Sequence, residues 1–366
     1  MKGSFFLQDL SGENKQECSS MNNRKWPLAV VAFLVLIFIA VGSFISVRKY
    51  SCFAYADWDL AIYSNFCFNA IRGDLFSPLL GAHFFGNHLN LLMFLVVPVY
   101  FIFPSPVTLL IIQALMIAGA AFVVYFIARR EVGEWLGAAF SFLYLIHPGV
   151  LFTCLNEFHP ESFFPLFFFL AFYNMRENRT RLFLLFMFAC LLLKENFALT
   201  TAMLGLYCAF SQKKRLGWVV FGASVAWFAV STGFIIPALN RGVIGLAGIY
   251  PDFGDSPASI MVNMVLHPGR VIDVAFRSAK MVYMLKLLLP LCFLPVIGIQ
   301  ASIMALPVIA QHLLSVRPAE HSILYYYSIE ILPPLFIGAI IGQRLLMKIG
   351  HRILRRMVVL LVLLAG

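Results

Sequence analysis

Residues 27–46, PLAVVAFLVLIFIAVGSFIS, form an apolar run without a charged side chain. A run of about 20 apolar residues is long enough to cross the hydrocarbon core of a bilayer as a helix. The run begins late in the chain and lacks a small-residue cleavage site, so it predicts a retained membrane span rather than a signal peptide. The polar residues 1–26 before it are predicted to form a flexible cytoplasmic tail.

The remainder of the chain repeats this apolar pattern. Of the 366 residues, 61% are hydrophobic and 12% are charged, a composition that excludes an ordinary soluble domain. Further apolar runs occupy 89–103, 106–128, 135–151, 162–174, 182–193, 197–210, 216–236, 281–298, 300–314, 322–342 and 357–366. We expect an all-α fold, in which residues 27–366 form a polytopic transmembrane bundle of about ten to eleven spans.

The basic residues orient this bundle. The net charge of +10 does not indicate nucleic-acid binding, because the Lys and Arg residues gather in short loops between apolar runs. All of these clusters fall on one side of the membrane if run 89–103, about 22 Å of helix, is too short to cross a core of about 30 Å. The positive-inside rule then makes that side cytoplasmic. The clusters are Arg24-Lys25, Arg129-Arg130, Arg176/Arg179/Arg181, Lys213-Lys214-Arg215 and Arg344/Lys348/Arg352/Arg355/Arg356.

Two long segments then face the outer side, 47–105 and 237–280. Interfacial helices are expected in the first, and Ser256-Pro257 and Pro268 predict helix starts in the second. Ionisable groups close to a bilayer are costly and usually functional. Those at the predicted outer boundary are Asp57, Asp59, His83, His88, His147, Glu157, His159, Lys194, Glu195 and His321.

Asp59 stands at the start of the amphipathic segment DLAIYSNFCFNAI. Its carboxylate can cap this helix or act as a general base, and the two roles do not exclude each other. Asp57 is interpreted as a solvated side chain. Glu157 and His159, together with Asp57, could bind a divalent cation, although their spacing matches no standard metal motif.

Lys194 and Glu195 lie between two strongly apolar runs. Burying them requires a partner, so they either pair with each other at the end of a hairpin or meet another charged group or a ligand. Arg270 and Arg277 recur on one helical face. That face is either solvated at the membrane surface or forms a clamp for phosphate.

Signatures of several soluble enzyme classes are absent. The sequence contains no GxSxG, HExxH, P-loop or dinucleotide fingerprint, which excludes serine hydrolases of that type, zincins and nucleotide-driven pumps. The seven cysteines show no metal-ligand spacing, although Cys52 could pair with Cys67 or Cys154. Any chemistry must therefore use carboxylates, imidazoles and cations.

Several motifs between residues 50 and 345 resemble a known family. They are DWDLAIYSN (57–65), HFFGNHLNLLMFLVVPVYFIFPSPVTLLIIQAL (83–115), LYLIHPGVLFTCLNEFHPES (143–162), LLLKENFAL (191–199), YPDFGDSPASIMVNMVLHPGRV (250–271), LLPLCFLPVIG (288–298) and ILYYYSIEILPPLFIGAI (323–340). This set resembles the bacterial multi-pass predicted membrane proteins classed as a domain of unknown function, which are similar in plan to GT-C-type glycosyltransferases. Members often carry a histidine where this chain has Tyr326.

The resemblance implies transfer of a sugar from a polyprenyl-phosphate carrier to an acceptor on the outer face of the bacterial inner membrane. Asp59 matches the acidic residue of the first outer loop, with Asp57 as the second candidate, and would act as general base. The other implied substrate-binding residues would position the acceptor or a metal, or stabilise the phosphate; they are His83, His88, Glu157, His159, Lys194, Glu195, Arg270 and Arg277.

Two other functions remain open at this point. A transporter or flippase for a lipid-linked or polar solute could use the same outer cavity without chemistry, and an inactive relative could bind lipid alone. Alternating access requires polar groups at mid-membrane and on both faces. The polar groups of this chain gather mainly at the predicted outer face, which favours an enzyme.

Overall fold

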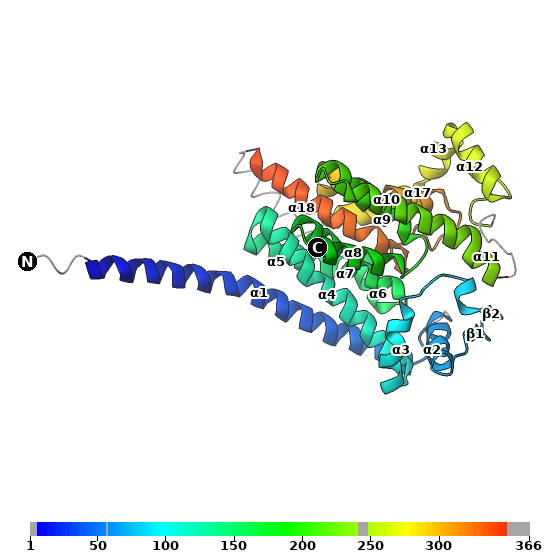
Figure 1. Ribbon diagram of the computed structural model, residues 1–366, viewed down its shortest axis with the longest axis horizontal. Coiled ribbons are helices and arrows are strands. Elements are labelled where there is room, and N and C mark those ends of the chain that lie inside the picture. The colour runs from blue at the N-terminus through cyan, green and yellow to red at the C-terminus, as the bar shows by residue number, and fades with distance from the viewer. Residues whose placement is uncertain (1–5, 56–57, 241–247, 350–366) are drawn as a thin grey trace, which may run out of the picture.

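The computed structural model describes residues 6–55, 58–240 and 248–349. These residues form a helical bundle (Figure 1), which confirms the predicted all-α class. The helices are α1 (Phe6–Ser51), α2 (Asp59–Ala70), α3 (Met93–Ile102), α4 (Pro106–Val132), α5 (Glu134–Ile146), α6 (Pro148–Leu155), α7 (Phe164–Arg176), α8 (Thr180–Leu191), α9 (Phe197–Ser211), α10 (Leu216–Val230), α11 (Ile236–Leu239), α12 (Pro257–Leu266), α13 (Pro268–Ala275), α14 (Ser278–Leu288), α15 (Leu294–Ile297), α16 (Ile299–Ser302), α17 (Leu306–Leu314) and α18 (Leu332–Lys348).

Short elements complete the chain. The strands β1 (Phe76–Ser77) and β2 (Ala82–His83) form an antiparallel pair in which Phe76 lies opposite His83. Single turns of 3-10 helix are η1 (Phe84–Gly86), η2 (Pro160–Phe163), η4 (Leu289–Leu291), η5 (Ile303–Ala305) and η6 (Tyr326–Glu330), and a π-helical turn, η3 (Ser231–Ile235), joins α10 to α11.

Three of the described helical segments are long and apolar enough to cross a membrane: Trp26–Ser51, Pro106–Val132 and Leu216–Leu239. The pair α5 and α6 makes a fourth if its 47° bend lies within one span. Shorter helices occupy the other predicted runs that the structure describes. The total of ten to eleven crossings therefore stays a prediction.

Helix α4 lies at the centre of the bundle and packs against α1, α5, α7 and α18. Its buried face carries small residues, including the fully buried Ala114, Ala118 and Ala121, which let neighbouring backbones approach closely. An even closer approach occurs between the α15–α16 junction and α18, where a Cβ at Gly298 would collide with the carbonyl oxygen of Gly338. Helix α1, by contrast, runs along the edge of the bundle (Figure 1). Its exposed side chains Phe33, Leu36 and Phe44 suit contact with lipid.

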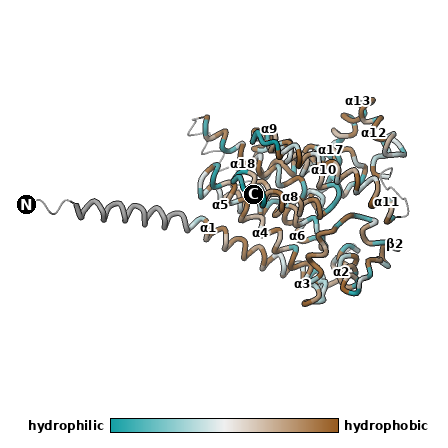
Figure 2. Tube along the Cα trace, in the orientation of Figure 1, coloured by the Kyte–Doolittle hydropathy of each residue, from teal (hydrophilic) through white to brown (hydrophobic). Residues whose placement is uncertain are grey.

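Charged side chains mark one end of the bundle. Glu131, at the end of α4, binds Arg176 of α7 at 2.8 Å and Arg344 of α18 at 2.6 Å. Lys214, which follows α9, donates to the carbonyl oxygen of Met175 at 3.2 Å. Members of four of the basic clusters defined by the sequence thus meet at this end, and Figure 2 shows hydrophilic residues there. That this end faces the cytoplasm stays a prediction.

The described part of segment 47–105, the predicted first outer loop, lies at the opposite end. Figure 1 shows α2, α3 and the two strands gathered there, while the N-terminal part of α1 extends the other way. Helix α3 has 10 residues, about 15 Å, and is too short to cross a bilayer. Helix α1 already begins at Phe6, within the segment predicted to be a flexible tail. The described cysteines, including Cys52, Cys67 and Cys154, are free thiols, so neither candidate disulfide forms.

Candidate functional site

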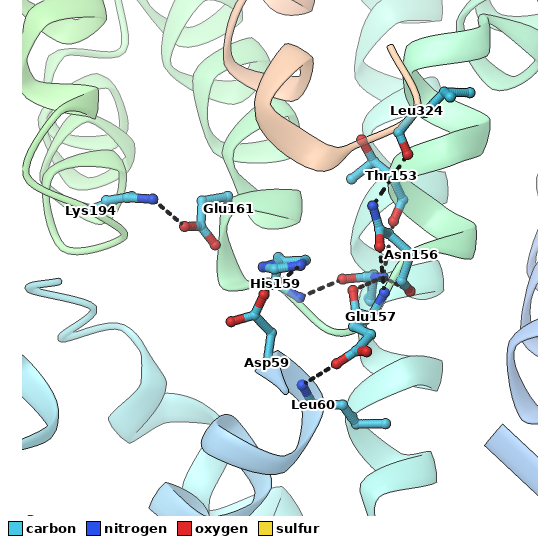
Figure 3. Close-up of polar contacts among 10 residues, drawn as sticks. Asp59, Leu60, Thr153, Asn156, Glu157, His159, Glu161, Lys194 and Leu324 are labelled. Atoms are coloured by element: carbon cyan, nitrogen blue, oxygen red, sulfur yellow. Dashed lines mark hydrogen bonds and ion pairs between the residues drawn. The ribbon is translucent and has the colours of Figure 1, made fainter. Parts of the chain in front are cut away.

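The candidate site begins at the first residue of α2, Asp59. The preceding Trp58 supplies no side-chain cap. Glu157, from the loop after α6, takes that role, because its Oε2 accepts a hydrogen bond from the backbone N–H of Leu60 at 2.8 Å. A carboxylate from a distant loop therefore holds the start of α2, and the side chain of Asp59 points towards His159 (Figure 3).

The loop that carries Glu157 and His159 is fixed by Gln113, a fully buried residue of α4. The amide nitrogen of Gln113 donates to the carbonyl oxygens of Thr153 and Glu157, both at 3.1 Å. Its amide oxygen accepts from the backbone N–H of His159 at 2.8 Å. Because both ends of one buried amide are used, the positions of Glu157 and His159 are coupled to the central helix.

His159 is the buried partner of Asp59. Its Nε2 lies 3.6 Å from Oδ2 of Asp59, and the His159 side chain is 3% exposed whereas that of Asp59 is 39% exposed. One face of the imidazole stacks on Tyr326, with ring centroids 3.5 Å apart. Burial lowers the pKa of His159 to about 3, so the ring is neutral near pH 7. A neutral imidazole can orient the carboxylate without neutralising its charge.

This lowered pKa predicts how stability depends on pH. Between about pH 6.5 and pH 3 the unfolded chain binds a proton at His159 that the folded protein does not, so the free energy of unfolding falls as pH falls. From pH 7 to pH 5 we expect His159 to contribute a loss of about 2 kcal/mol. Unfolding in detergent at both pH values, compared with His159→Phe, checks this. An equal decrease in the two proteins would contradict it.

Lys194 and Glu195 form pairs with other residues of the site. The Lys194 ammonium binds Oε1 of Glu161 at 2.8 Å, and both side chains are nearly inaccessible. Glu195 binds Nδ1 of His88 at 2.7 Å and accepts from the backbone N–H of Leu89 at 3.0 Å. The turn after α8 is thereby tied to η2 and to the first outer loop.

Charge pairing offsets the effect of burial on these groups. Burial alone would raise the pKa of Glu161, but Lys194 holds it below its usual value. Burial would lower the pKa of Lys194, but Glu161 and Glu195 raise it. The pKa of Glu195, which burial would also raise, falls to about 2 because of His88 and Lys194. All three groups are therefore charged at neutral pH.

Tyr326 lies between the Asp59–His159 pair and the Lys194–Glu161 pair. Its ring stacks on His159 and on Tyr327, at centroid distances of 3.5 and 4.3 Å. The Lys194 ammonium lies 5.7 Å from the same ring, within the range of a cation–π contact. The family resemblance drew attention to this position, because it implies a histidine there in many members.

A cavity of about 650 Å³ adjoins the start of α2. Leu60, Ser64 and Tyr100 line it together with Glu157, and most of the wall is apolar. The hydroxyls of Ser64 and Tyr100 are hydrogen-bonded at 2.7 Å. The cavity is large enough for a small polar ligand, and the carboxylate of Glu157 borders it.

Other predicted site residues have different surroundings. The Nδ1 atom of His83 accepts from the backbone N–H of Phe85 at 3.2 Å, which stabilises the start of η1. Arg277 pairs with Asp252 at 3.2 Å. Arg270 is exposed on α13, which lies away from α2 in Figure 1. Because α13 ends at Ala275 and Arg277 precedes α14, the prediction that Arg270 and Arg277 share one helical face is wrong. Asp57 lies outside the described residues.

A metal site receives no support from the described part of the chain. There, no three His, Cys, Asp or Glu side chains are grouped so that they could hold an ion. The predicted set of Glu157 and His159 includes Asp57, whose position is not described, so a divalent cation stays a hypothesis.

Comparison with models of protein families identifies a match for most of the chain. A family model described as "Predicted membrane protein (DUF2079)" matches residues 49–365. No curated protein matches the chain. The matched segment covers most of the 366 residues. It contains all the site residues described above, from Asp59 to Tyr326. The chain therefore belongs to the DUF2079 family of predicted membrane proteins.

Proposed function

We propose that this membrane protein is a glycosyltransferase that moves a sugar from a polyprenyl-phosphate carrier to an acceptor hydroxyl at the outer face of the bacterial inner membrane. In this proposal the chain crosses the membrane several times and its N-terminus is cytoplasmic. One observation carries the proposal: a partly exposed carboxylate, Asp59, lies 3.6 Å from the buried, neutral His159 at the end of the bundle opposite the basic residues. An accessible, oriented carboxylate suits a general base.

The proposed step is a direct displacement with inversion. The acceptor oxygen forms a bond to the anomeric carbon while the bond from that carbon to the phosphate oxygen breaks, and the electron pair leaves with the lipid phosphate. Asp59 takes the proton of the acceptor hydroxyl. His159 orients Asp59, and Glu157 does so indirectly by holding the start of α2. His88, through Glu195, positions the neighbouring segment of the first outer loop.

Stabilising the leaving phosphate requires a cation. Lys194 was predicted for this task, and its charge is next to the site, but its ammonium is bound by Glu161 at 2.8 Å. Its role in the proposal is therefore to hold Glu161 and the ring of Tyr326 in place. Arg270 and Arg277 belong to the α12–α14 region, and the proposed step does not use them.

A transporter of lipid-linked or polar solutes is the second candidate. The buried pair Lys194–Glu161 favours it, because buried charges within a membrane bundle often mark transport pathways. Purified protein in proteoliposomes, supplied with radiolabelled polyprenyl-phosphate sugars and a panel of acceptors, separates the candidates. Labelled acceptor is expected for the enzyme. Movement of the carrier between leaflets without labelled acceptor would refute the enzyme and favour the transporter.

A further inference from the structure

A second cavity, of about 210 Å³, lies between α1, α5 and α6. Every lining residue is aliphatic, aromatic, glycine or cysteine, among them Ile37, Gly42 and Leu151. Ile37 and Val41, on its α1 side, are 43% and 51% exposed. Because α1 lies at the edge of the bundle, this groove opens towards the hydrocarbon of the bilayer.

The apolar groove and the larger cavity follow each other along α1. The groove extends to Ile45, and Tyr50 lines the larger cavity. Lys49 lies between them. Its ammonium donates to the carbonyl oxygen of Leu155, a groove residue, at 2.7 Å, and lies 4.5 Å from the ring of Tyr55, a residue of the larger cavity.

The Lys49 ammonium is suited to an anionic group at this junction. An ammonium has three N–H donors, and the carbonyl of Leu155 uses one. A cation at the end of an apolar groove matches a ligand with an apolar chain and a charged head. Lys194 differs in this respect, because Glu161 binds its ammonium at 2.8 Å, whereas Glu157 acts on the Lys49 ammonium by longer-range electrostatic attraction.

We propose that the groove between α1, α5 and α6 binds the single hydrocarbon chain of a polyprenyl phosphate, with its phosphate at Lys49 and any attached sugar in the larger cavity. The carrier would then enter sideways from the bilayer and present its anomeric carbon near Glu157 and the start of α2. The identity of the lipid as the sugar carrier rests on the proposed glycosyl transfer. Binding of the lipid does not require that transfer to occur.

Photo-crosslinking tests the binding directly. The full-length protein in phospholipid vesicles receives a tritiated polyprenyl phosphate with a diazirine on its apolar chain, and crosslinked peptides are mapped by mass spectrometry. We expect crosslinks within 34–45 and 142–155. Ile37→Trp should fill the groove and reduce crosslinking at least fivefold. Leu36→Trp, an equally bulky change on the exposed face of α1 outside the groove, should leave it within twofold.

The charged head is tested with a second matched pair of variants. Lys49→Gln should weaken competition by unlabelled polyprenyl phosphate at least fivefold, whereas the neighbouring exposed Arg48→Gln should change it less than twofold. Crosslinks outside the groove, equal effects of the matched variants, or equal competition by phosphatidylglycerol would overturn the proposal and show bulk lipid only. Specific crosslinking without sugar transfer would keep this site and refute the glycosyltransferase instead.

Discussion

Asp59→Asn is expected to reduce the initial rate of sugar transfer about 10²- to 10⁴-fold, the range typical for loss of a general base. An amide cannot take the proton of the acceptor hydroxyl, yet it keeps the shape of the carboxylate beside His159. The rate is measured with radiolabelled polyprenyl-phosphate sugar at saturating acceptor, after the variant has been shown to elute as wild type in size-exclusion chromatography.

Asp74→Asn is the matched control for this variant. Asp74 also belongs to the first outer loop, where its Oδ1 accepts from the backbone N–H of Phe76 at 2.9 Å, a bond that an asparagine can also accept. The rate of sugar transfer by Asp74→Asn should stay within twofold of wild type. A rate for Asp59→Asn similar to that of the control would remove Asp59 from the mechanism.

The second large effect is expected on stability. Lys194→Met leaves the Glu161 carboxylate buried without its cation, and breaking a buried pair in this way typically lowers the free energy of unfolding by about 3–5 kcal/mol. The double variant Lys194→Met with Glu161→Gln should recover part of this loss, since it buries no lone charge. Unfolding is followed by tryptophan fluorescence in mixed micelles of increasing denaturing detergent.

Lys348→Met is the control, because Lys348 is exposed at the end of α18 and a surface change should shift the free energy of unfolding by less than about 0.5 kcal/mol. If Lys194→Met were as stable as this control, the Lys194–Glu161 pair would contribute nothing to holding the site.

Local patterns in the sequence predicted much of the architecture. Composition and apolar runs indicated the all-α class, and Ser256-Pro257 and Pro268 marked the starts of α12 and α13. The positions of the basic clusters predicted that they would share one end, and Glu131 brings members of two of them together by binding both Arg176 and Arg344. These features depend on periodicity, caps and charge, which short stretches of sequence contain.

The contacts within the site could not be predicted in the same way. Gln113 resembles any polar residue in an apolar helix, and its bonds to Thr153, Glu157 and His159 span 40 residues or more. Asp59 was considered as a cap for α2, whereas Glu157 makes that bond across 97 residues. Such pairings follow from helix packing, which a single sequence does not specify.

Cysteine labelling from outside the cell tests most directly whether the acids and imidazoles of the site face away from the cytoplasm. In a background with Cys18 and Cys52 replaced by serine, Trp58→Cys is placed beside Asp59 at a residue that is 67% exposed, and Lys213→Cys is placed in a basic turn. A membrane-impermeant maleimide should modify Trp58→Cys in intact spheroplasts and Lys213→Cys after permeabilisation only. Modification of both under the same condition would put the two segments in one compartment and contradict an outer-face active site.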